Sequence, residues 1–377
     1  MKIAMVYDMI YPFNVGGAEE RNYLLAKELI RIGHEVHFFG AKLWKGKDII
    51  VHDDIVMHGV YTSKGLYKKS KRTYIEPIIF ALKLKKHLFK EDFDVVDCTA
   101  FPYFSVFTSK WFANAKKIPF VITWHEVWDD YWKGYVGFVA PFARWIERKV
   151  AKLTKTHISV SDRTKKRLLA INPNAKVDVV PNAIDFDLID AIKPAKERFD
   201  LIYCGRLMPH KNVDYILKAV TILKHDFSNV SCLIVGKGPE KERLLQLTKR
   251  LDIENNVTFK DFLPDQKDVY ALMKSSKIFV SPSILEGFGI VVIEAMACGL
   301  PIIGVSHKWN AAEDVINENK AGFVVKLSAE AIAEKVSFLL KRKSSYNQIV
   351  GNNLQKCRKY EIEKIAKKIE SIYKKLK

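Results

Sequence analysis

Residues 281–301 read SPSILEGFGIVVIEAMACGLP, which is a complete unit of α/β architecture. A β-type apolar run ends near Ser281, a loop with Gly287 and Gly289 follows, and a helical pattern begins near Ile290. The sequence therefore predicts a strand, a glycine turn and a helix in direct succession. This order is typical of parallel sheets built from βαβ units.

The start of this helix is the expected anion site, because helix N-termini carry unpaired N–H donors and the positive end of the helix dipole. The amides concerned are those of Gly287, Phe288, Gly289, Ile290 and Val291. Glu286 lies before the turn and Glu294 one turn inside the helix, so both carboxylates are expected to face one ligand and to bind sugar or ribose hydroxyls. The competing interpretation is an ordinary α/β turn with Glu294 on the surface.

The alternation of strands and helices extends over most of the chain and occurs twice. Strands of the first series are predicted at Lys2–Tyr7, Glu35–Phe39, Val95–Cys98, Phe120–Thr123, His157–Val160 and Val177–Val180. Those of the second series are predicted at Leu201–Cys204, Val230–Val235, Val257–Lys260, Ile278–Ser281 and Pro301–Gly304. Helices are predicted at Ala18–Arg31, Tyr74–Lys90, Pro141–Lys152, Val213–Lys224, Glu240–Leu251 and Ile290–Cys298.

A polar, proline-containing stretch at residues 190–200 separates the two series. We therefore expect an α/β protein with two Rossmann-like domains, residues 1–190 and 191–360, facing a central cleft at the carboxyl ends of their strands. The lysine-rich segment 361–377 is expected to form a C-terminal helix. We expect this helix to pack on one of the two domains, either the C-terminal domain or, by folding back, the N-terminal domain.

Composition excludes several classes of protein. With 48% hydrophobic residues over 377 positions, the chain is globular rather than disordered. Its charge-free stretches are shorter than the roughly 18 residues of a spanning helix. The N-terminal MKIAMVYDMI indicates a strand rather than a signal peptide, so we expect a cytoplasmic protein. Five scattered cysteines without C-x-x-C spacing indicate free thiols rather than disulfides or a zinc site.

The formal net charge of +19 is concentrated in two segments. Lys64–Lys90 holds nine basic residues against one acid, and Lys341–Lys377 holds twelve against three. Such clusters indicate an anionic partner or, more simply, solvated helix faces. The predicted helix Tyr74–Lys90 mixes apolar residues and lysines, so it is expected either to lie on an anionic membrane surface or to pack on its own sheet.

Six ordered motifs resemble those of glycosyltransferase family 4. Glu286 and Glu294 stand at the E-x7-E spacing of retaining glycosyltransferases, and EGFGIVVIEAMACGLPII resembles the family signature. The other matching stretches are GGAEER (Gly16–Arg21), TWHE (Thr123–Glu126), VSD with VVPNAID (Val160–Asp162, Val179–Asp185), YCGRLMPHKN (Tyr203–Asn212) and LIVGKGPEKERL (Leu233–Leu244). The resemblance covers residues from about 3 to about 325 and implies the GT-B fold.

On the donor side, a strand and glycine turn present Arg206 and Lys211, two cations suited to a departing diphosphate. The resemblance implies that this pair holds the diphosphate without a metal. It also implies that the loop with Gly236 and Gly238 flanks the nucleotide base together with Leu263. An NAD fingerprint is disfavoured, because the third glycine of G-x-G-x-x-G is replaced by a lysine.

On the acceptor side, Gly16 and Gly17 allow main chain to approach the sugar or phosphate. Arg21 is expected either to meet an anionic acceptor or to be a surface cation. His125 follows a strand, and the resemblance implies a role beside the sugar or acceptor hydroxyl. The aromatic residues around it are expected to stack on a sugar ring or to fill core, and they are Trp124, Trp128, Tyr131 and Trp132.

The resemblance thus implies a retaining, metal-independent transferase that moves a hexose from a nucleotide-diphosphate sugar to a hydroxyl acceptor, such as a lipid-linked or cell-surface glycan. The expected catalytic residues are Glu286, His125, Arg206 and Lys211. The Asp-x-Asp pairs, Asp92/Asp94 and Asp185/Asp187, are interpreted as surface or turn aspartates rather than metal ligands. The alternatives are a nucleotide-sugar epimerase or hydrolase of the same fold, and a basic nucleic-acid-binding protein, although the basic segments hold few aromatic residues for base stacking.

Two stretches depart from the family pattern. After the strand that follows Glu294, the usual small glycine-rich turn is replaced by VSHKWNAAEDVI, with Trp309 and Asn310 in the turn. The frequent histidine of the strand DVVDCTAF is absent, with Asp97 and Cys98 there instead. The first change puts a local ligand contact in doubt, and neither removes a predicted diphosphate contact.

Overall fold

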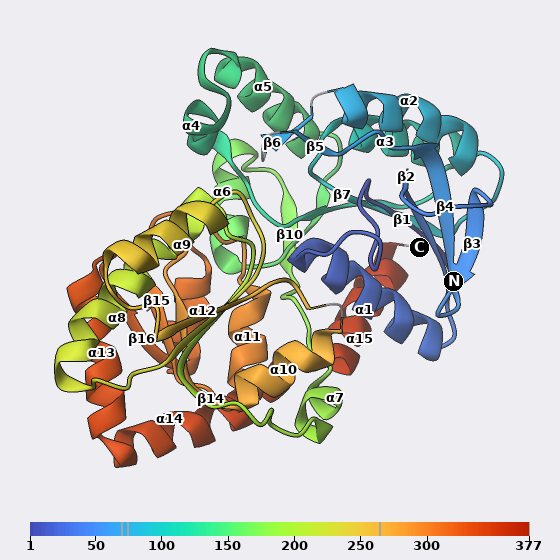
Figure 1. The fold of residues 1–377 in the computed structure, drawn as a ribbon. Coiled ribbons are helices and arrows are strands. Elements are labelled where there is room, and N and C mark those ends of the chain that lie inside the picture. Colours follow the sequence, from blue (N-terminus) through green and yellow to red (C-terminus); the bar gives the residue numbers. More distant parts are fainter. Residues whose placement is uncertain (69–70, 74, 264, 377) are drawn as a thin grey trace. The chain divides into compact units, whose positions relative to one another are not determined.

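The protein is described by a computed structural model that covers residues 1–68, 71–73, 75–263 and 265–376. It forms two compact units, Met1–Ala183 with Ile362–Lys377 and Ile184–Glu361, each built around one sheet (Figure 1). The predicted α/β class with two Rossmann-like sheets is confirmed. The chain passes from one unit to the next at Ala183, before the expected position near residue 190, because helix α7 (Phe186–Ala191) packs in the second unit.

The first unit contains an eight-stranded sheet in the order β10-β9-β8-β7-β1-β2-β4-β3, parallel except for the antiparallel pair β3–β4. Its strands are β1 (Lys2–Val6), β2 (Glu35–Lys42), β3 (Ile49–His52), β4 (Ile55–Thr62), β7 (Val95–Thr99), β8 (Phe120–Trp124), β9 (Thr156–Ser159) and β10 (Lys176–Val179). All six predicted strands are present. A small ribbon of β5 (Tyr67–Lys68) and β6 (Lys71–Arg72) stands apart from this sheet.

The hairpin β3–β4 is absent from the sequence-based prediction. Its two central residues, Asp53 and Asp54, have φ of 47° and 61°, the left-handed values of a two-residue hairpin turn. Glycine or asparagine usually marks such a turn, and here both positions are aspartate. The hairpin therefore carries no strong local signal in the sequence.

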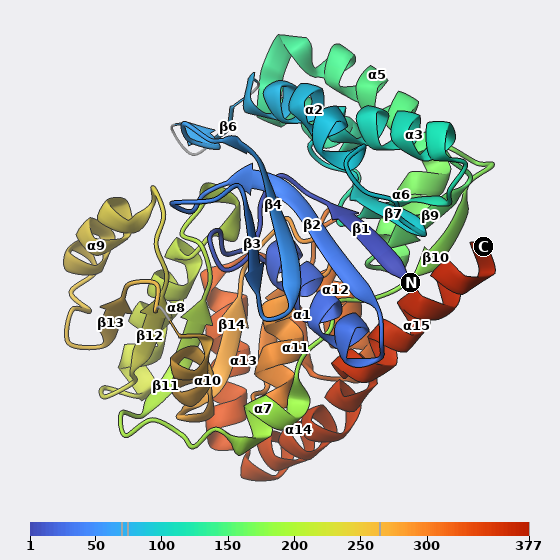
Figure 2. The same ribbon diagram turned by 90° about the vertical axis from the view of Figure 1, so that its right-hand side faces the viewer.

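Helices flank the first sheet. They are α1 (Gly17–Arg31), α2 (Ile75–Leu88), α3 (Phe104–Lys116), α4 (Trp132–Val136), α5 (Ala140–Ala151), α6 (Asp162–Ile171) and α15 (Ile362–Leu376). The predicted helix from Tyr74 corresponds to α2, and Tyr74 itself lies outside the described residues. Helix α15 lies along α1 (Figure 2). Its side chains Ile365, Ile369 and Tyr373 belong to the core of this unit.

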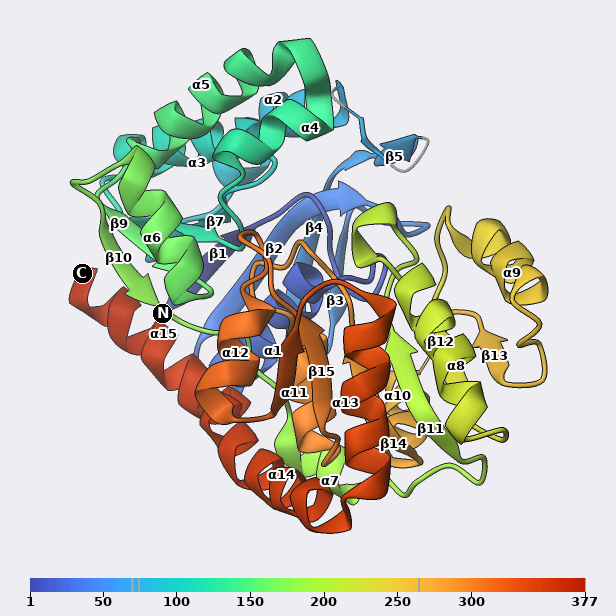
Figure 3. The same cartoon turned by 90° about the vertical axis from the view of Figure 1, so that its left-hand side faces the viewer.

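The second unit contains a six-stranded parallel sheet in the order β13-β12-β11-β14-β15-β16. Its strands are β11 (Phe199–Cys204), β12 (Cys232–Val235), β13 (Val257–Lys260), β14 (Ser276–Ser281), β15 (Ile302–Val305) and β16 (Gly322–Val325). Its longer helices are α8 (Asp214–Asp226), α9 (Lys241–Arg250), α10 (Gln266–Lys274), α11 (Ile290–Ala297), α12 (Ala312–Asn319), α13 (Ala329–Lys341) and α14 (Lys343–Lys356). Figure 3 shows α8 and α13 side by side on one face of this sheet.

Strand β11 is central in this order, with β12 on one side and β14 on the other. The loops after these strands therefore begin at the same edge of the sheet, which is where ligands bind in open α/β sheets. Among the described helices, none combines the length and apolar character that crossing a bilayer requires.

We predict that Ile369→Ala destabilises the first unit by about 2–5 kcal/mol, because it opens a cavity where α15 meets the core. The measurement is urea unfolding followed by tryptophan fluorescence, which reports mainly on this unit because only Trp309 lies in the other. Lys368→Ala, on the exposed side of α15, is the matched control and should change stability little. Equal unfolding midpoints for Ile369→Ala and the unmodified protein would show that α15 adds no stability.

Candidate functional site

The predicted anion site lies at the N-terminus of α11, directly after the loop that follows β14. Gly289 occupies the capping position with φ +84°, and a Cβ there would lie 2.7 Å from the Cβ of Ala312. Glycine is therefore required by both backbone conformation and packing. Because Gly289 has no side chain, it makes no capping hydrogen bond to the first turn of α11.

The side chains around this turn have different surroundings. Phe288 is buried and contacts the Tyr360 ring edge-on, with centroids 5.7 Å apart. Gly287, Ile290 and Val291 are half-buried. Phe288 thus anchors the turn in the core of the second unit.

Two predicted site residues, Lys211 and Glu286, form an ion pair with Nζ 2.5 Å from Oε1. Lys211 ends the 3₁₀ helix η3 (Pro209–Lys211), and the side-chain amide of Asn212 then donates to the carbonyls of His210 and Pro282, both at 3.1 Å. These bonds tie the lysine loop to the segment that leads to Glu286. Burial, assisted by Lys211, lowers the pKa of His210 to about 4, so this imidazole is neutral at pH 7.

The backbone of Glu286 is fixed by the stretch that departs from the family pattern. Its N–H donates to the carbonyl of Trp309 at 3.0 Å, and its carbonyl accepts from the N–H of Ala311 at 2.8 Å. Nearby, Nδ1 of His307 lies 2.9 Å from the carbonyl of Ile284. The unusual turn therefore preserves the position of Glu286 by main-chain pairing.

Arg206 is exposed on the loop after β11, and its carbonyl accepts from the Tyr203 hydroxyl at 3.1 Å. Gly236 and Gly238 lie against this loop. A Cβ on Gly236 would lie 1.9 Å from the carbonyl oxygen of Gly205, and one on Gly238 would lie 2.2 Å from that of Leu207. The structure thus assigns a packing role to these two glycines, because their missing side chains let the loop that carries Arg206 approach.

The loop after β13 lies next to the loop of Gly236 and Gly238. The N–H of Gly236 donates to the carbonyl of Lys260 at 2.9 Å, at the end of β13. Beyond it, Leu263 is half-buried and Phe262 is 40% exposed. The loops predicted to hold the donor therefore lie together in the second unit.

Glu294 is buried rather than on the surface, with 3% exposure. Its Oε1 accepts from the hydroxyl of Tyr270 at 2.7 Å and from the side-chain amide of Gln266 at 3.1 Å. Both donors lie on α10, four residues apart and thus on one helix face. Gln266 and Tyr270 are not among the predicted site residues, although their spacing of four in the helical segment DQKDVYALMK places both on one helix face.

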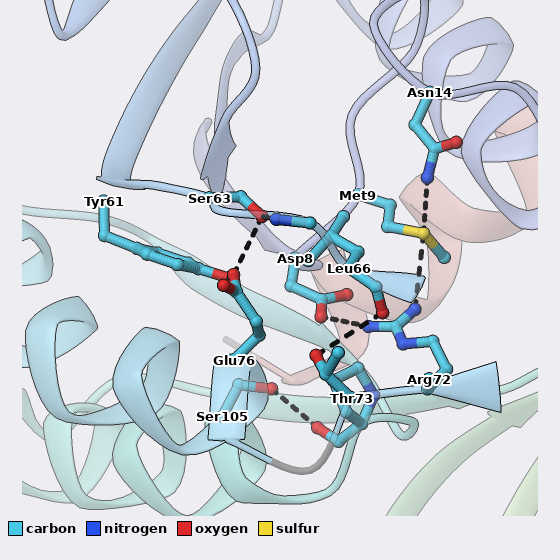
Figure 4. A network of polar contacts seen from close by, with 12 residues as sticks. Asp8, Met9, Asn14, Tyr61, Ser63, Leu66, Arg72, Thr73, Glu76 and Ser105 are labelled. Carbon is cyan, nitrogen blue, oxygen red and sulfur yellow. Dashed lines mark hydrogen bonds and ion pairs between the residues drawn. The ribbon is translucent and has the colours of Figure 1, made fainter. Parts of the chain in front are cut away.

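In the first unit, Gly16 caps α1 with extended backbone and Gly17 begins the helix. The loop before them is anchored at its base by Asp8, which is fully buried and pairs with Arg72 (Figure 4). The same guanidinium lies 3.3 Å from the sulfur of Met9. The glycine loop therefore begins from a fixed point after β1.

Arg21 is not a surface cation, because only 1% of it is exposed. One guanidinium nitrogen lies 3.5 Å from the carbonyl oxygen of Val180, and the charge interacts with Asp97 and Tyr373. Asp97 accepts hydrogen bonds from Thr123 at 2.7 Å and from Tyr373 at 2.5 Å. Asp97, in the strand that lacks the family's frequent histidine, thus belongs to a buried polar network.

His125 follows β8 directly, as predicted. Its Nε2 is buried and has no hydrogen-bond partner among the described residues. Burial, assisted by the charge of Arg21, lowers the pKa of His125 to about 3, so the ring is neutral at pH 7. The unpaired nitrogen of a neutral imidazole can donate a hydrogen bond to a hydroxyl group or accept one from it, depending on the tautomer.

The aromatic cluster divides into two groups. Trp124 and Trp132 are buried and fill core, whereas Trp128 and Tyr131 are half-buried. Trp128 stacks on Phe101 at 5.2 Å between centroids. Only the half-buried pair retains surface that a sugar ring could use.

Three of the four aspartates in the Asp-x-Asp pairs have structural partners. Asp92 pairs with Lys116 at 2.7 Å, and Asp94 accepts from the N–H of Lys2 at 2.7 Å. Asp185 caps α7 by accepting from the N–H of Leu188 at 2.9 Å. These contacts agree with the interpretation of these residues as surface or turn aspartates.

Curated proteins similar to this chain are glycosyltransferases. An uncharacterized glycosyltransferase of Haemophilus influenzae is 26% identical over 95% of this chain and 96% of its own length. The GDP-mannose-dependent alpha-(1-6)-phosphatidylinositol monomannoside mannosyltransferase of Mycolicibacterium smegmatis is 26% identical over 88% of this chain and 87% of its own length.

Solved structures share the fold at lower identity. Sucrose-phosphate synthase from Thermosynechococcus elongatus has a TM-score of 0.82 at 18% identity and covers 100% of this chain and 98% of its own. Anabaena HepE, solved in complex with UDP and glucose, has a TM-score of 0.76 at 17% identity with complete coverage of both chains.

Family profiles account for most of the sequence. The profile described as Glycosyltransferase Family 4 matches residues 15–188, and the one described as Glycosyl transferases group 1 matches residues 185–356. The two profiles follow each other along the chain, as the two sheets do. The chain thus belongs to the family 4, group 1 glycosyltransferases of GT-B fold and transfers a sugar from a nucleotide-sugar donor.

Proposed function

We propose that the protein is a retaining hexosyltransferase that needs no metal and transfers a hexose from a nucleotide-diphosphate sugar to a hydroxyl of a lipid-linked or cell-surface glycan. The observation that carries this proposal is the Lys211–Glu286 ion pair, together with the uncapped N-terminus of α11 in the same unit. The pair offers one cation for the leaving diphosphate and one carboxylate for the sugar hydroxyls.

The second unit would bind the donor. The diphosphate would lie against the amides of residues 287–291, with Arg206 and Lys211 neutralising the charge that develops as it leaves. Glu294 would hold the ribose hydroxyls, and its bonds from Gln266 and Tyr270 fix the carboxylate in one orientation. Leu263 and the loop of Gly236 and Gly238 would flank the nucleotide base.

The first unit would bind the acceptor. Gly16 and Gly17 would bring main chain close to the transferred sugar, and the neutral His125 would accept or donate a hydrogen bond at the acceptor hydroxyl. Arg21 is buried, so it would act indirectly. Its positive charge lies close enough to His125 to favour the neutral imidazole. Retention without a covalent carboxylate intermediate rests on membership of the family.

The acceptor class is proposed from the named relatives and from the surface of the first unit. Two similar proteins act on phosphatidylinositol lipids by name: the monomannoside mannosyltransferase above and a human phosphatidylinositol N-acetylglucosaminyltransferase component. Helices α2, α3 and α5 lie in one layer on the first sheet (Figures 2 and 3). Large apolar side chains are exposed on these helices and on the 3₁₀ helix Gly137–Val139 before α5, and they include Ile75, Leu82, Trp111, Phe138, Phe142 and Trp145.

Basic side chains accompany these apolar groups. Lys83, Lys85 and Lys86 lie on α2, and the Lys85 ammonium lies 4.1 Å from the centroid of the Trp111 ring. Exposed aromatic and aliphatic groups with lysines around them suit an anionic membrane surface. We therefore place the protein in the cytoplasm, peripheral at the membrane face. Residues 69 and 70 of the basic segment lie outside the described residues.

We predict that alanine at Arg206, Lys211 or Glu286 lowers turnover by at least about tenfold each, because the two cations hold the leaving diphosphate and Glu286 orients the transferred sugar. Turnover is measured as acceptor-dependent release of nucleoside diphosphate, with a donor first chosen by thermal shift. Arg250→Ala, an exposed arginine at the end of α9, is the control. Unchanged turnover in all three variants would refute the site. Product analysis without acceptor separates transfer from epimerisation or hydrolysis.

A second prediction concerns metal removal. Turnover should be the same within error after dialysis against EDTA and after addition of Mg²⁺ or Mn²⁺, because fixed cations and amides neutralise the diphosphate in this proposal. A loss of activity that Mg²⁺ or Mn²⁺ restores would contradict it. The measurement is initial rate at saturating donor.

A third prediction concerns membrane contact. The triple variant Leu82→Ser, Phe138→Ser and Phe142→Ser should bind phosphatidylglycerol vesicles at least about tenfold more weakly, because it removes apolar groups that are 73%, 95% and 60% exposed. Cosedimentation measures the partition coefficient. Ile222→Ser, an exposed apolar residue of the second unit, is the control. Equal binding by the triple variant, or no binding by the unmodified protein, would exclude this surface.

A further inference from the structure

Three side chains with metal-binding chemistry converge in the first unit, and none of them takes part in the proposed transfer. They are His37 on β2, His58 on β4 and Glu91 in the segment between α2 and β7. His37 Nδ1 lies 2.8 Å from His58 Nε2. Glu91 Oε2 lies 3.5 Å from His37 Nδ1, and Glu91 Oε1 lies 3.8 Å from His58 Nε2. Among the described residues, these three are the one group of His, Cys, Asp or Glu side chains whose ligand atoms lie close enough to share an ion.

The sheet register explains why the two imidazoles meet. His58 is the register partner of Phe39 on the neighbouring parallel strand, and His37 lies two residues before Phe39. Side chains two residues apart on a strand share one face, so both rings project to the same side of the sheet. His37 and His58 are 2% and 1% exposed, whereas the Glu91 side chain is 28% exposed. Access from solvent therefore runs past Glu91.

The donor set suits a transition metal. Two imidazole nitrogens and one carboxylate are ligands that Zn²⁺ prefers, at about 2.0–2.2 Å from the ion. Ligand atoms on adjacent corners of such a tetrahedron are separated by about 3.4 Å. The two nitrogens are 2.8 Å apart, Glu91 Oε2 lies 3.5 Å from His37 Nδ1, and Glu91 Oε1 lies 3.8 Å from His58 Nε2. With one carboxylate oxygen as the shared ligand, all three ligand atoms lie within 4.8 Å of one another. Small side-chain shifts would therefore complete a three-ligand site with one position left for water.

A second carboxylate orients His37 for this role. Glu35 Oε1 lies 2.7 Å from His37 Nε2 and accepts a hydrogen bond from the Nε2–H group. In this tautomer the Nδ1 lone pair is directed at His58 and Glu91. This is the outer-sphere arrangement that holds metal-binding histidines in place. Without a metal, His58 Nε2–H donates to that lone pair. Metal binding requires the His58 proton to move from Nε2 to Nδ1, so that Nε2 presents a lone pair to the ion.

One neighbour opposes metal binding. The ammonium of Lys2 lies 2.5 Å from Glu91 and 3.1 Å from Glu35, so it competes with an ion for the Glu91 carboxylate and repels its charge. Removing this cation should strengthen metal binding, whereas removing a ligand should weaken it. The two opposite effects distinguish a metal site from a hydrogen-bonded histidine pair.

We propose that His37, His58 and Glu91 bind one divalent transition-metal ion of the Zn²⁺ class. The ion would join the segment after α2 to strands β2 and β4 and would stabilise the first unit. This inference does not rest on the proposed transferase site, and its readouts are binding and stability rather than turnover.

The test is calorimetric titration of ZnCl₂ into the tag-free, full-length protein after EDTA dialysis. We expect one ion per chain, at least about 100-fold weaker binding in His37→Gln and in His58→Gln, and about 10–100-fold weaker binding in Glu35→Gln. Lys2→Met should bind more tightly than the unmodified protein. With CoCl₂, the unmodified protein should develop the visible absorption of a four-coordinate site.

His225→Gln, an exposed histidine of the second unit, is the control and should bind like the unmodified protein. Circular dichroism melts show whether each variant is folded. If a ligand variant fails to fold, Lys2→Met still decides, because it retains all three ligands. Absence of stoichiometric binding, equal binding by His58→Gln, or no gain in Lys2→Met would overturn the proposal and leave a hydrogen-bonded histidine pair only.

Discussion

The ion pair between Lys211 and Glu286 is the interaction on which the account of catalysis depends. Hydrogen bonds hold both partners in place. The side-chain amide of Asn212 ties the lysine loop to Pro282, and main-chain bonds to Trp309 and Ala311 hold Glu286. Without ligand, the two charges neutralise each other. In the proposed reaction, the diphosphate of the donor binds the Lys211 ammonium, and the sugar hydroxyls of the same donor bind the Glu286 carboxylate. Donor binding would therefore replace the ion pair with two contacts to the ligand. A site that is preorganised in this way stabilises charge at little reorganisation cost.

Glycine residues in the second unit serve packing as much as ligand approach. Gly289 is needed for its left-handed backbone and for its contact with Ala312. Gly236 and Gly238 allow one loop to lie directly on another, which positions the loop of Arg206. In the first unit, buried charges have a similar positioning role, because Arg21, Asp97 and Tyr373 join α1, β7 and α15 beneath the segment of His125. The C-terminal helix is therefore part of the first unit's core and of its polar network.

Much of this architecture can be predicted from the sequence, because strands buried on both faces read as short apolar runs and the glycine turns mark their ends. The hairpin β3–β4 could not be predicted in this way, since its turn is Asp53–Asp54. The pairing of Lys211 with Glu286, 75 residues apart, follows from the neighbouring places of β11 and β14 and not from any local pattern. The burial of Arg21 could not be predicted either, because its partners Asp97 and Tyr373 are distant in the chain. The roles of the site residues remain predictions.

The most direct test of the central claim is a crystal structure of the protein with an intact nucleotide-diphosphate sugar or its nucleoside diphosphate. The account predicts phosphate oxygens within hydrogen-bond distance of the first-turn amides of α11 and of the Arg206 and Lys211 side chains, with the Lys211–Glu286 contact lengthened or broken. A nucleotide bound elsewhere, with Lys211 and Glu286 still paired and the α11 amides facing only solvent, would contradict it.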